Sequence, residues 1–255
     1  MTSVAIGLID RGGPASVAGD TAHCLARLCI YTVANRVPLD VIRWQCGSML
    51  DMGRNNLVED FLRRDHEWLL WVDSDMTFPP DALVRLLEVA DPDEAPVVGA
   101  LTFGYKTGRG PYPVIYTKTY ARNGDYGFQV VDGYPPDQVV EVGATGSAFI
   151  LIHRTVFEKT RQPRPHYWYG YALLPGKDGE LDKLGEDLSF CLLLAEHDIP
   201  IHVHTGVGTG HVKSFLWDEA AYQARHATFA AAFGLQEEEE DSPRLEDAGR
   251  PSPTD

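Results

Sequence analysis

The stretch that decides the fold is WLLWVDSDMTFPPDALVRLL, from Trp68 to Leu87. It begins with Trp68–Val72, which is apolar at every position, as expected of a strand covered on both faces of a parallel sheet. Pro79-Pro80 then suits the first turn of a helix, and apolar side chains follow at helical spacing. Two carboxylates, Asp73 and Asp75, stand between the strand and the helix. Open α/β sheets bind ligands at the carboxyl ends of their strands, so this stretch predicts both a fold and the place of a site.

Strand and helix patterns alternate on both sides of this stretch. The expected strands are 3–9, 39–44, 68–72 and 96–103, and the expected helices are 18–36, 53–64 and the one that opens at Pro79. Such alternation is typical of a parallel sheet with right-handed crossovers. We therefore expect an α/β fold with a mostly parallel central sheet flanked by helices.

The pattern changes after the fourth strand. Residues 105–142 are rich in Gly, Pro, Tyr and Asp and predict a hairpin-rich insertion. The later expectations are a strand at 147–152, a short helix at 155–159, a loop-like segment at 162–184, a helix opened by Gly185, a strand at 199–204, a glycine-rich turn at 206–210 and a helix at 217–233. We expect one domain over residues 1–235 and a disordered acidic tail over residues 236–255.

The net charge of −15 restricts the partners of this 255-residue chain. The tail holds eight acids and two bases, so it carries −6 of that charge and the rest of the chain carries −9. The excess of acids argues against electrostatic binding to a nucleic-acid backbone. No apolar run approaches the roughly 20 residues of a membrane span. The amino terminus lacks the pattern of a signal peptide, so we expect a cytoplasmic protein with no membrane span.

The cysteines and histidines do not predict a zinc site. The four cysteines lack CxxC spacing and are expected to be buried free thiols: Cys24, Cys29, Cys46 and Cys191. His202 and His204 alternate on one strand and could join His211, but no Cys or acid lies close by at zinc spacing.

Asp73 and Asp75 are the strongest local indication of chemistry. Side chains at positions i and i+2 of a strand point the same way, so both carboxylates could reach one Mg²⁺ or Mn²⁺ that bridges nucleotide phosphates. The alternative is an acidic turn that caps the following helix. That helix has its own first-turn acid in Asp81, which favours the metal interpretation.

Two further features lie late in the chain. Gly185-Glu186-Asp187 opens a helix, where acids can simply favour the helix dipole, or where the dipole keeps a carboxylate base ionised. His211 follows a glycine-rich turn, and a lone histidine at such a place is more often an ordinary surface residue.

Together these features resemble the GT-A glycosyltransferases, most of all the family 2-type enzymes, including small versions encoded by bacteriophages. The resemblance covers roughly residues 3 to 215. It is carried by the following segments in this order: WLLWVDSDMTFPPDALVRLL (Trp68–Leu87), GATGSAFILI (Gly143–Ile152), Gly185-Glu186-Asp187 and Gly210-His211. The resemblance implies a transferase that moves a sugar from a nucleotide-diphosphate sugar, with a UDP-sugar favoured as donor, to an acceptor hydroxyl.

The resemblance also implies roles for single residues. Asp73 and Asp75 match the metal-binding Asp-x-Asp, with Asp75 as a ligand of Mn²⁺ or Mg²⁺ and Asp73 near the ribose or metal. His211 would complete the metal shell. Asp187 matches the catalytic base of inverting members, with Glu186 beside it.

Other residues would hold the donor. The implied donor contacts are Asp10, Arg11 and Gly12 for the base, Arg54 and Asn55 for the diphosphate, and Asp73 with Ser74 in the Asp-x-Asp turn. The loop Gly143–Gly146 would face the sugar or the acceptor. The chain lacks the usual Pro-x-Tyr/Phe-Asn after its first strand, so the identity of the base stays open.

Several alternatives remain at this point. A sugar nucleotidyltransferase shares the fold, and a non-catalytic nucleotide- or carbohydrate-binding module would use the motif only to bind metal. The sequence fits an inverting or a retaining outcome and fixes no oligomeric state. The aromatic segment His166–Tyr171 could stack on a sugar or base, or pack over the core.

The acceptor is open as well. A hydroxymethylated pyrimidine in phage DNA is one candidate, and a hydroxyl of a polysaccharide, lipid or protein fits equally. A modest basic patch beside the aromatic segment, expected at the mouth of the active site, favours DNA: Arg154, Lys159, Arg161, Arg164 and Lys177.

Overall fold

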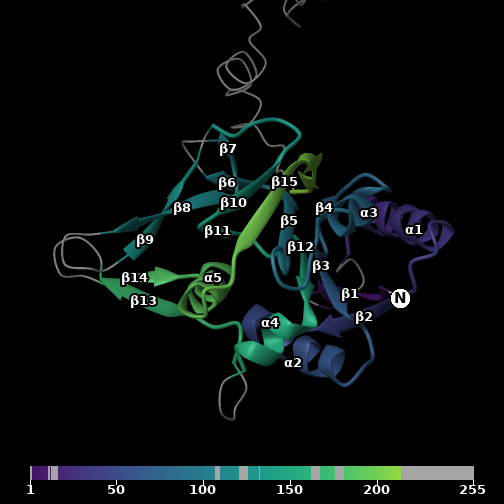
Figure 1. The fold of residues 1–255 in the computed structure, drawn as a ribbon, viewed down its shortest axis with the longest axis horizontal. Coiled ribbons are helices and arrows are strands. Elements are labelled where there is room, and N and C mark those ends of the chain that lie inside the picture. Colours follow the sequence, from purple (N-terminus) through teal and green to yellow (C-terminus); the bar gives the residue numbers. More distant parts are fainter. Residues whose placement is uncertain are drawn as a thin grey trace, which may run out of the picture. The chain divides into compact units, whose positions relative to one another are not determined.

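A seven-stranded mixed sheet forms the centre of the fold, with strand order β10-β15-β5-β12-β3-β1-β2 (Figure 1). Its strands are β1 (Val4–Asp10), β2 (Leu39–Gln45), β3 (Trp68–Asp73), β5 (Val97–Leu101), β10 (Val139–Val142), β12 (Phe149–His153) and β15 (Ile201–Gly208). Five strands run in one direction, while β12 and β10 run against their neighbours. The predicted α/β fold with a mostly parallel central sheet is therefore confirmed.

The computed structural model describes residues 2–10, 12, 17–106, 110–120, 126–131, 133–161, 167–175 and 181–213. The elements named here all belong to one compact unit, Met1–Val212, and the remainder, Lys213–Asp255, forms a second unit. The predicted helix at 217–233 and the predicted acidic tail at 236–255 lie outside the described residues. No described helix is long and apolar enough to cross a membrane.

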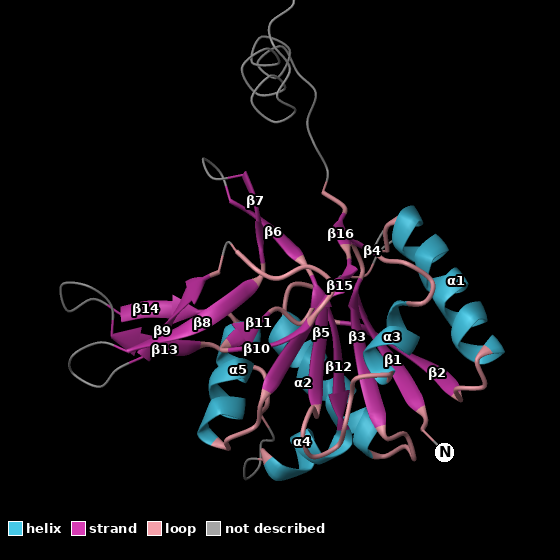
Figure 2. Cartoon of the chain, turned by 45° about the horizontal axis from the view of Figure 1, so that its top comes forward, coloured by secondary structure: helices cyan, strands magenta, loops and turns pink. Residues whose placement is uncertain are grey.

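Within the described part of the chain, five helices cover the two faces of the sheet (Figure 2). They are α1 (Gly19–Ala34), α2 (Leu50–Leu62), α3 (Ala82–Leu87), α4 (Arg154–Lys159) and α5 (Glu186–Glu196). One face packs against α1 and α3, and the other packs against α2, α4 and α5. Trp68–Val72 is apolar throughout because its side chains alternate between two buried faces: Leu69 and Trp71 lie with α2 and α5, and Leu70 and Val72 with α1 and α3.

Small ladders surround the central sheet at its carboxyl-end side. The predicted hairpin-rich insertion contains the pairs β6 (Phe103–Lys106) with β7 (Gly110–Pro113), and β8 (Ile115–Tyr120) with β9 (Tyr126–Val130), the second pair extended by β11 (Ala144–Thr145). Two further ladders are β4 (Met76–Thr77) with β16 (Gly210–His211), and β13 (Ala172–Pro175) with β14 (Leu181–Leu184).

Two predicted loops are strands in the structure. The segment 162–184 contains the β13–β14 hairpin, whose run Ala172–Leu174 lacks the apolar and polar alternation that would have indicated a strand. The glycine-rich turn at 206–210 is wrong too, because β15 continues to Gly208 and Gly210 enters β16. Side chains crowd both glycines: a Cβ atom at Gly206 would meet the carboxylate of Asp137, and one at Gly210 would meet the Thr77 hydroxyl, so these neighbours would have to move aside.

The cysteines are free thiols as predicted, but the expectation that they are buried holds only for Cys191. The other three are partly exposed, because each lies at the margin of a core cluster on α1 or in the turn after β2.

Helix α2 begins at Leu50, one turn before the predicted start. At Gly53 it packs closely against Cys46, in the turn after β2. A Cβ atom at Gly53 would overlap the Cβ atom of Cys46. Gly53→Ala should therefore lower the free energy of unfolding by about 1–3 kcal/mol, although alanine normally favours a helix over glycine. Gly19→Ala in α1 is the matched control, because nothing lies within 4 Å of the added methyl. Urea unfolding checks both variants, and equal stability of the two would contradict the close contact.

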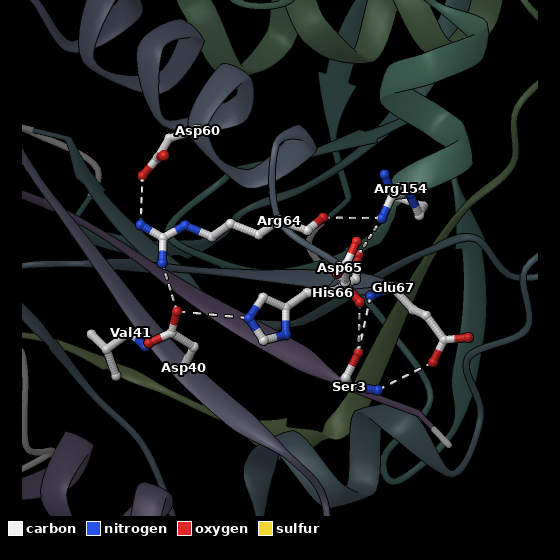
Figure 3. Close-up of polar contacts among 9 residues, drawn as sticks. All are labelled: Ser3, Asp40, Val41, Asp60, Arg64, Asp65, His66, Glu67 and Arg154. Carbon is white, nitrogen blue, oxygen red and sulfur yellow. Dashed lines mark hydrogen bonds and ion pairs between the residues drawn. The ribbon is translucent and has the colours of Figure 1, made fainter.

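A polar network ties the sheet together at the amino end of β3, the edge opposite Asp73 (Figure 3). Arg64 donates to Asp40 on β2 and to Asp60 on α2, at 2.7 and 2.9 Å. Arg154 at the start of α4 donates to the main-chain oxygens of Arg64 and His66. These bonds fix the turn that leads into β3.

Candidate functional site

The candidate site begins where β3 ends at Asp73. Asp73 follows Leu69 and Trp71 on the face that α2 and α5 cover, so its carboxylate lies on the α2 side of the sheet. On the neighbouring strand β1, Asp73 pairs with Ile9, so the next residue, Asp10, lies at the same edge of the sheet. The carboxyl ends of β1 and β3 thus bring the predicted base-side and metal-side residues together.

Asp75 lies one turn beyond the strand, beside His211. The two-stranded β4–β16 ladder pairs His211 with Met76, and the Val212 N–H donates to the main-chain oxygen of Asp75 at 2.7 Å. Asp75 Oδ2 and His211 Nε2 are 3.1 Å apart, and their side chains are 36% and 25% exposed. The structure therefore joins two residues that are 136 positions apart in the sequence.

The Asp75–His211 pair has the chemistry of a divalent-metal site. His211 Nδ1 lies 3.1 Å from the Phe103 main-chain oxygen, which can only accept, so Nδ1 carries the hydrogen of this contact and Nε2 is the ring nitrogen that faces Asp75. A divalent cation bound here would take the place of a proton on Nε2. A carboxylate oxygen and an imidazole nitrogen then face the same point. Within the described part of the chain, no group of three or more His, Cys, Asp or Glu could hold a metal ion. Two protein ligands fit a Mg²⁺-type cation that takes its other ligands from substrate phosphates and water.

The two aspartates of the Asp-x-Asp motif have different partners. Asp73 Oδ1 accepts from Arg54 Nη2 at 2.9 Å, whereas Asp75 faces His211. The strand alternation that predicted one shared cation does not apply, because β3 ends at Asp73 and the chain turns at Ser74-Asp75. Of the three predicted ligands, the structure places Asp75 and His211 together and turns Asp73 toward α2. Ser74 lies in that turn, and its main-chain oxygen accepts from Ala18.

Arg54 on α2 is buried among aromatic rings and carboxylates. It is 1% exposed, with its guanidinium carbon 5.1 Å from the centre of the Trp71 ring and 5.6 Å from that of Tyr169. Burial lowers the pKa of Arg54, but Asp73 and Asp187 raise it by more, so the pKa lies above its ordinary value and the group stays charged. Arg54 is thus the cation at the centre of the candidate site.

Three carboxylates surround this cation. Besides Asp73, Asp187 Oδ1 lies 3.7 Å from Arg54 Nη2, and Glu186 Oε1 lies 4.0 Å from Arg54 Nε. Burial raises the pKa of Asp73, which Arg54 partly offsets. Burial, followed by the charge of Asp187, also raises the pKa of Glu186. Carboxylates gathered around one buried arginine, two of them (Asp73 and Glu186) with raised pKa values, are typical of a functional site.

Asp187 occupies the second position of α5, whose first cap residue is Gly185 as predicted. Its Oδ1 atom is buried and has no hydrogen-bond partner among the residues that the structure describes, while the side chain as a whole is 32% exposed. The other oxygen, Oδ2, lies 3.7 Å from where a Cβ atom of Gly146 would stand. The predicted substrate-facing loop Gly143–Gly146 therefore lies beside this carboxylate.

Asp10 at the end of β1 is almost fully buried, at 1% exposure. Its carboxylate accepts from the Gly12 N–H at 2.7 Å and from Arg43 on β2. Gly12 has a φ of +80°, a conformation that glycine adopts readily. Arg11, the third predicted base contact, lies outside the described residues.

Asn55 uses its whole amide to hold the aromatic segment against α2. Its Oδ1 accepts from the N–H groups of Trp168 and Tyr169, and its Nδ2 donates to the main-chain oxygens of Tyr169 and Asp51, at distances from 2.7 to 3.0 Å. The residue is 6% exposed. This geometry favours a structural role for Asn55 over the predicted contact with a diphosphate.

Asn55→Ala should therefore cost about 2–4 kcal/mol of unfolding free energy, because it leaves buried main-chain groups of Trp168 and Tyr169 without partners. Asn35→Ala, which removes an exposed hydrogen bond at the end of α1, is the control and should cost less than about 0.5 kcal/mol. Chemical denaturation measures both. An Asn55→Ala protein as stable as the control would remove the structural role.

The aromatic segment divides between the two expected roles. Trp168 and Tyr169 belong to the core, at 2% and 0% exposure, whereas Tyr167 and Tyr171 are 44% and 52% exposed. Lys183 on β14 lies over the Tyr171 ring, 3.9 Å from its centre. His166 lies outside the described residues.

Some residues of the site were not expected from the sequence. Trp71 looked like ordinary core, and no pattern linked it to Arg54. The Phe103 oxygen, which sets the tautomer of His211, has no sequence signal because any residue supplies a main-chain carbonyl. Tyr169 could have been found only through the aromatic character of its segment.

The proposed basic mouth is wrong for Arg154. β12 runs antiparallel to β3, so His153 lies opposite Trp68 and Arg154 lies at the edge away from Asp73. There it pairs with Glu158 and with the network of Figure 3. Two other members of that patch, Arg164 and Lys177, lie outside the described residues.

Comparisons with known proteins find only distant similarities to solved structures. No protein-family model and no curated protein matches it. The chain is similar to the solved structure of A197 from STIV, with a TM-score of 0.46, 17% identity and coverage of 84% of this chain and 87% of that one. It is also similar to GalNAc-T7 with UDP, GalNAc and Mn²⁺ (TM-score 0.47, 10% identity, 84% of this chain and 44% of that one). A third similar structure is S. aureus TarS 1-349 in complex with UDP-GlcNAc, with a TM-score of 0.45, 13% identity and coverage of 85% of this chain and 60% of that one. No residue role follows from these similarities.

Proposed function

We propose that the chain is a metal-dependent glycosyltransferase of GT-A type, which moves a sugar from a nucleotide-diphosphate sugar to an acceptor hydroxyl. One observation carries the proposal. A metal-capable pair, Asp75 with His211, and a buried arginine with three carboxylates meet at the carboxyl edge of β1 and β3. In this proposal the Asp75–His211 pair would hold the metal that faces the leaving diphosphate, and a carboxylate beside Arg54 would accept the proton.

Asp75 and His211 would hold the divalent cation. When bound there, such a cation neutralises the charge that develops on the leaving diphosphate. Asp10 and Gly12, at the end of the neighbouring strand, would lie on the nucleotide side. A UDP-sugar is the donor to test first.

Asp187 would act as the general base of an inverting reaction. The acceptor hydroxyl attacks the anomeric carbon, the bond from that carbon to the phosphate oxygen breaks, and the hydroxyl proton passes to Asp187 Oδ2. Its Oδ1 faces Arg54, and Gly146 leaves room beside Oδ2. In a retaining reaction the same carboxylate would instead orient the substrates.

The acceptor follows less directly from the structure. We propose a hydroxyl-bearing acceptor that reaches Asp187 past Gly146 and the exposed ring of Tyr171. If the chain is phage-encoded, we propose hydroxymethylated duplex DNA as its acceptor. This DNA is therefore one of the acceptors to be tested.

The direct test incubates the protein with Mn²⁺ or Mg²⁺ and a panel of nucleotide sugars, with and without acceptors. Release of nucleoside diphosphate that stops on chelation of the metal supports the proposal. Pyrophosphate formed from a nucleoside triphosphate and a sugar phosphate would instead indicate a nucleotidyltransferase. Tight nucleotide binding without turnover would indicate a binding module. Transfer to hydroxymethylated but not to unmodified duplexes would identify DNA as the acceptor.

A further inference from the structure

Arg54 is enclosed too completely to serve as an ordinary ligand for a diphosphate. Its side chain is 1% exposed, and the rings of Trp71 and Tyr169 lie within 5.1 and 5.6 Å of its guanidinium carbon. The two rings also contact each other edge to face, with centroids 5.8 Å apart. The guanidinium is therefore held in a fixed aromatic cage, where its planar, delocalised charge is favourable.

Within this cage, one nitrogen serves two elements. Arg54 Nη2 donates to Asp73 at the end of β3, at 2.9 Å, and lies 3.7 Å from Asp187 Oδ1 at the start of α5. Among the described residues, the buried Nε and Nη1 atoms have no hydrogen-bond partner. Nε lies 4.0 Å from Glu186 Oε1, and the two aromatic rings lie beside the guanidinium. Arg54 thus makes its polar contacts with the carboxylates of the candidate site.

We infer that Arg54 is a positioning residue, which ties Asp187 to Asp73 and so fixes the base relative to the donor side of the site. The inference rests on the proposed function. Because Arg54 faces Oδ1, the second carboxylate oxygen stays on the side of Gly146, where the acceptor hydroxyl would approach. Arg54 acts through Asp187 and does not touch the substrate.

This role differs measurably from a diphosphate contact. A donor ligand lost by mutation weakens nucleotide binding, and its effect adds to that of a missing base. A positioning residue leaves nucleotide binding nearly unchanged, and its effect disappears once the base it positions is gone.

The experiment compares Arg54→Met, Arg54→Lys and Asp187→Asn with the double variant Arg54→Met/Asp187→Asn. We expect Arg54→Met to lower kcat about 30-fold or more, as displacement of a catalytic group by an ångström can cost about a hundredfold. KM for the nucleotide sugar and Kd for UDP with Mn²⁺ should change less than threefold. Arg54→Lys should recover only part of kcat, because an ammonium lacks the planar fork. In the Asp187→Asn background, Arg54→Met should cost less than threefold.

Arg63→Met is the matched control. Arg63 stands just after α2, is 70% exposed and pairs only at the surface with Glu59, so kcat should stay within twofold of wild type. A UDP Kd raised more than tenfold by Arg54→Met, or additive losses in the double variant, would overturn the positioning role and favour a donor contact.

Thermal unfolding of the wild type, Arg54→Met, Asp187→Asn and the double variant tests the linkage without turnover. Arg54→Met leaves buried carboxylates without their cation and should lower Tm by about 10 °C. The loss should be smaller by at least about 3 °C in the Asp187→Asn background. An equal loss in both backgrounds would show that Arg54 and Asp187 are not linked. A wild-type protein without turnover or nucleotide binding, but with this thermal coupling, would refute the proposed function and leave the linkage standing.

Discussion

Asp75→Ala is expected to lower metal-dependent turnover by about a thousandfold or more and to leave the fold intact. Loss of a metal that neutralises developing charge removes several kcal/mol of transition-state stabilisation, and each 1.36 kcal/mol is about tenfold in rate. The fold should persist because the Asp75 main chain, which accepts from Val212, is unchanged. Nucleoside diphosphate release measures the rate, and Mn²⁺ binding by calorimetry or magnetic resonance measures the site.

Two variants sharpen this test. Asp60→Ala removes a carboxylate at the opposite edge, where it pairs with Arg64, and should leave turnover within twofold. His211→Gln should weaken Mn²⁺ binding, because it replaces the second proposed ligand. Unchanged activity of a folded Asp75→Ala protein would remove the metal assignment altogether.

Asp187→Asn is the second change with a large expected effect. Loss of a general base typically costs between about a hundredfold and ten-thousandfold in rate. The amide keeps the shape of the side chain and its place in the first turn of α5, so the UDP affinity should change less than threefold. Steady-state kinetics and nucleotide titration together separate these two quantities.

Glu186→Gln is the matched comparison, because Glu186 neighbours Asp187 and lies 4.0 Å from the same arginine. A smaller loss for Glu186→Gln is expected. The base role of Asp187 would be untenable if the UDP affinity collapsed while the rate persisted, or if Glu186→Gln had the larger effect. The anomeric configuration of the product, read by NMR, separates a base from a residue that only orients substrates.

Local patterns accounted for most of the elements but not for their neighbours in the sheet. Trp68–Val72 is apolar throughout because both its faces are buried, and that fact is visible in any window of sequence. The insertion of β12 between β3 and β5 is not visible, because it joins segments about fifty to eighty residues apart. The edge assigned to Arg154 was wrong for this reason, since the direction of β12 decides it.

The site was predictable in its residue types and less so in its contacts. Carboxylates after a buried strand and at a helix start indicated Asp73, Asp75 and Asp187. Which of these contacts Arg54 or His211 depends on the end of β3 and on the β4–β16 ladder, and neither has a strong local signal. The sequence equally could not show that the amide of Asn55 is fully used by the main chain.

The strand order has a consequence for how the protein acquires its active form. β1 pairs with β2 and β3, which all lie in the first 73 residues, whereas β3 also pairs with β12 about eighty residues away and β5 pairs with β15 about a hundred residues away. Closing such distant pairs is the slow part of folding. Arg54 and Asp73 belong to the part of the chain with local pairs, and Asp187 and His211 belong to the part that joins the sheet through long-range pairs. The candidate site is therefore complete only when both parts of the sheet are folded, so it depends on the long-range pairing of β5 with β15 as well as on the local pairs.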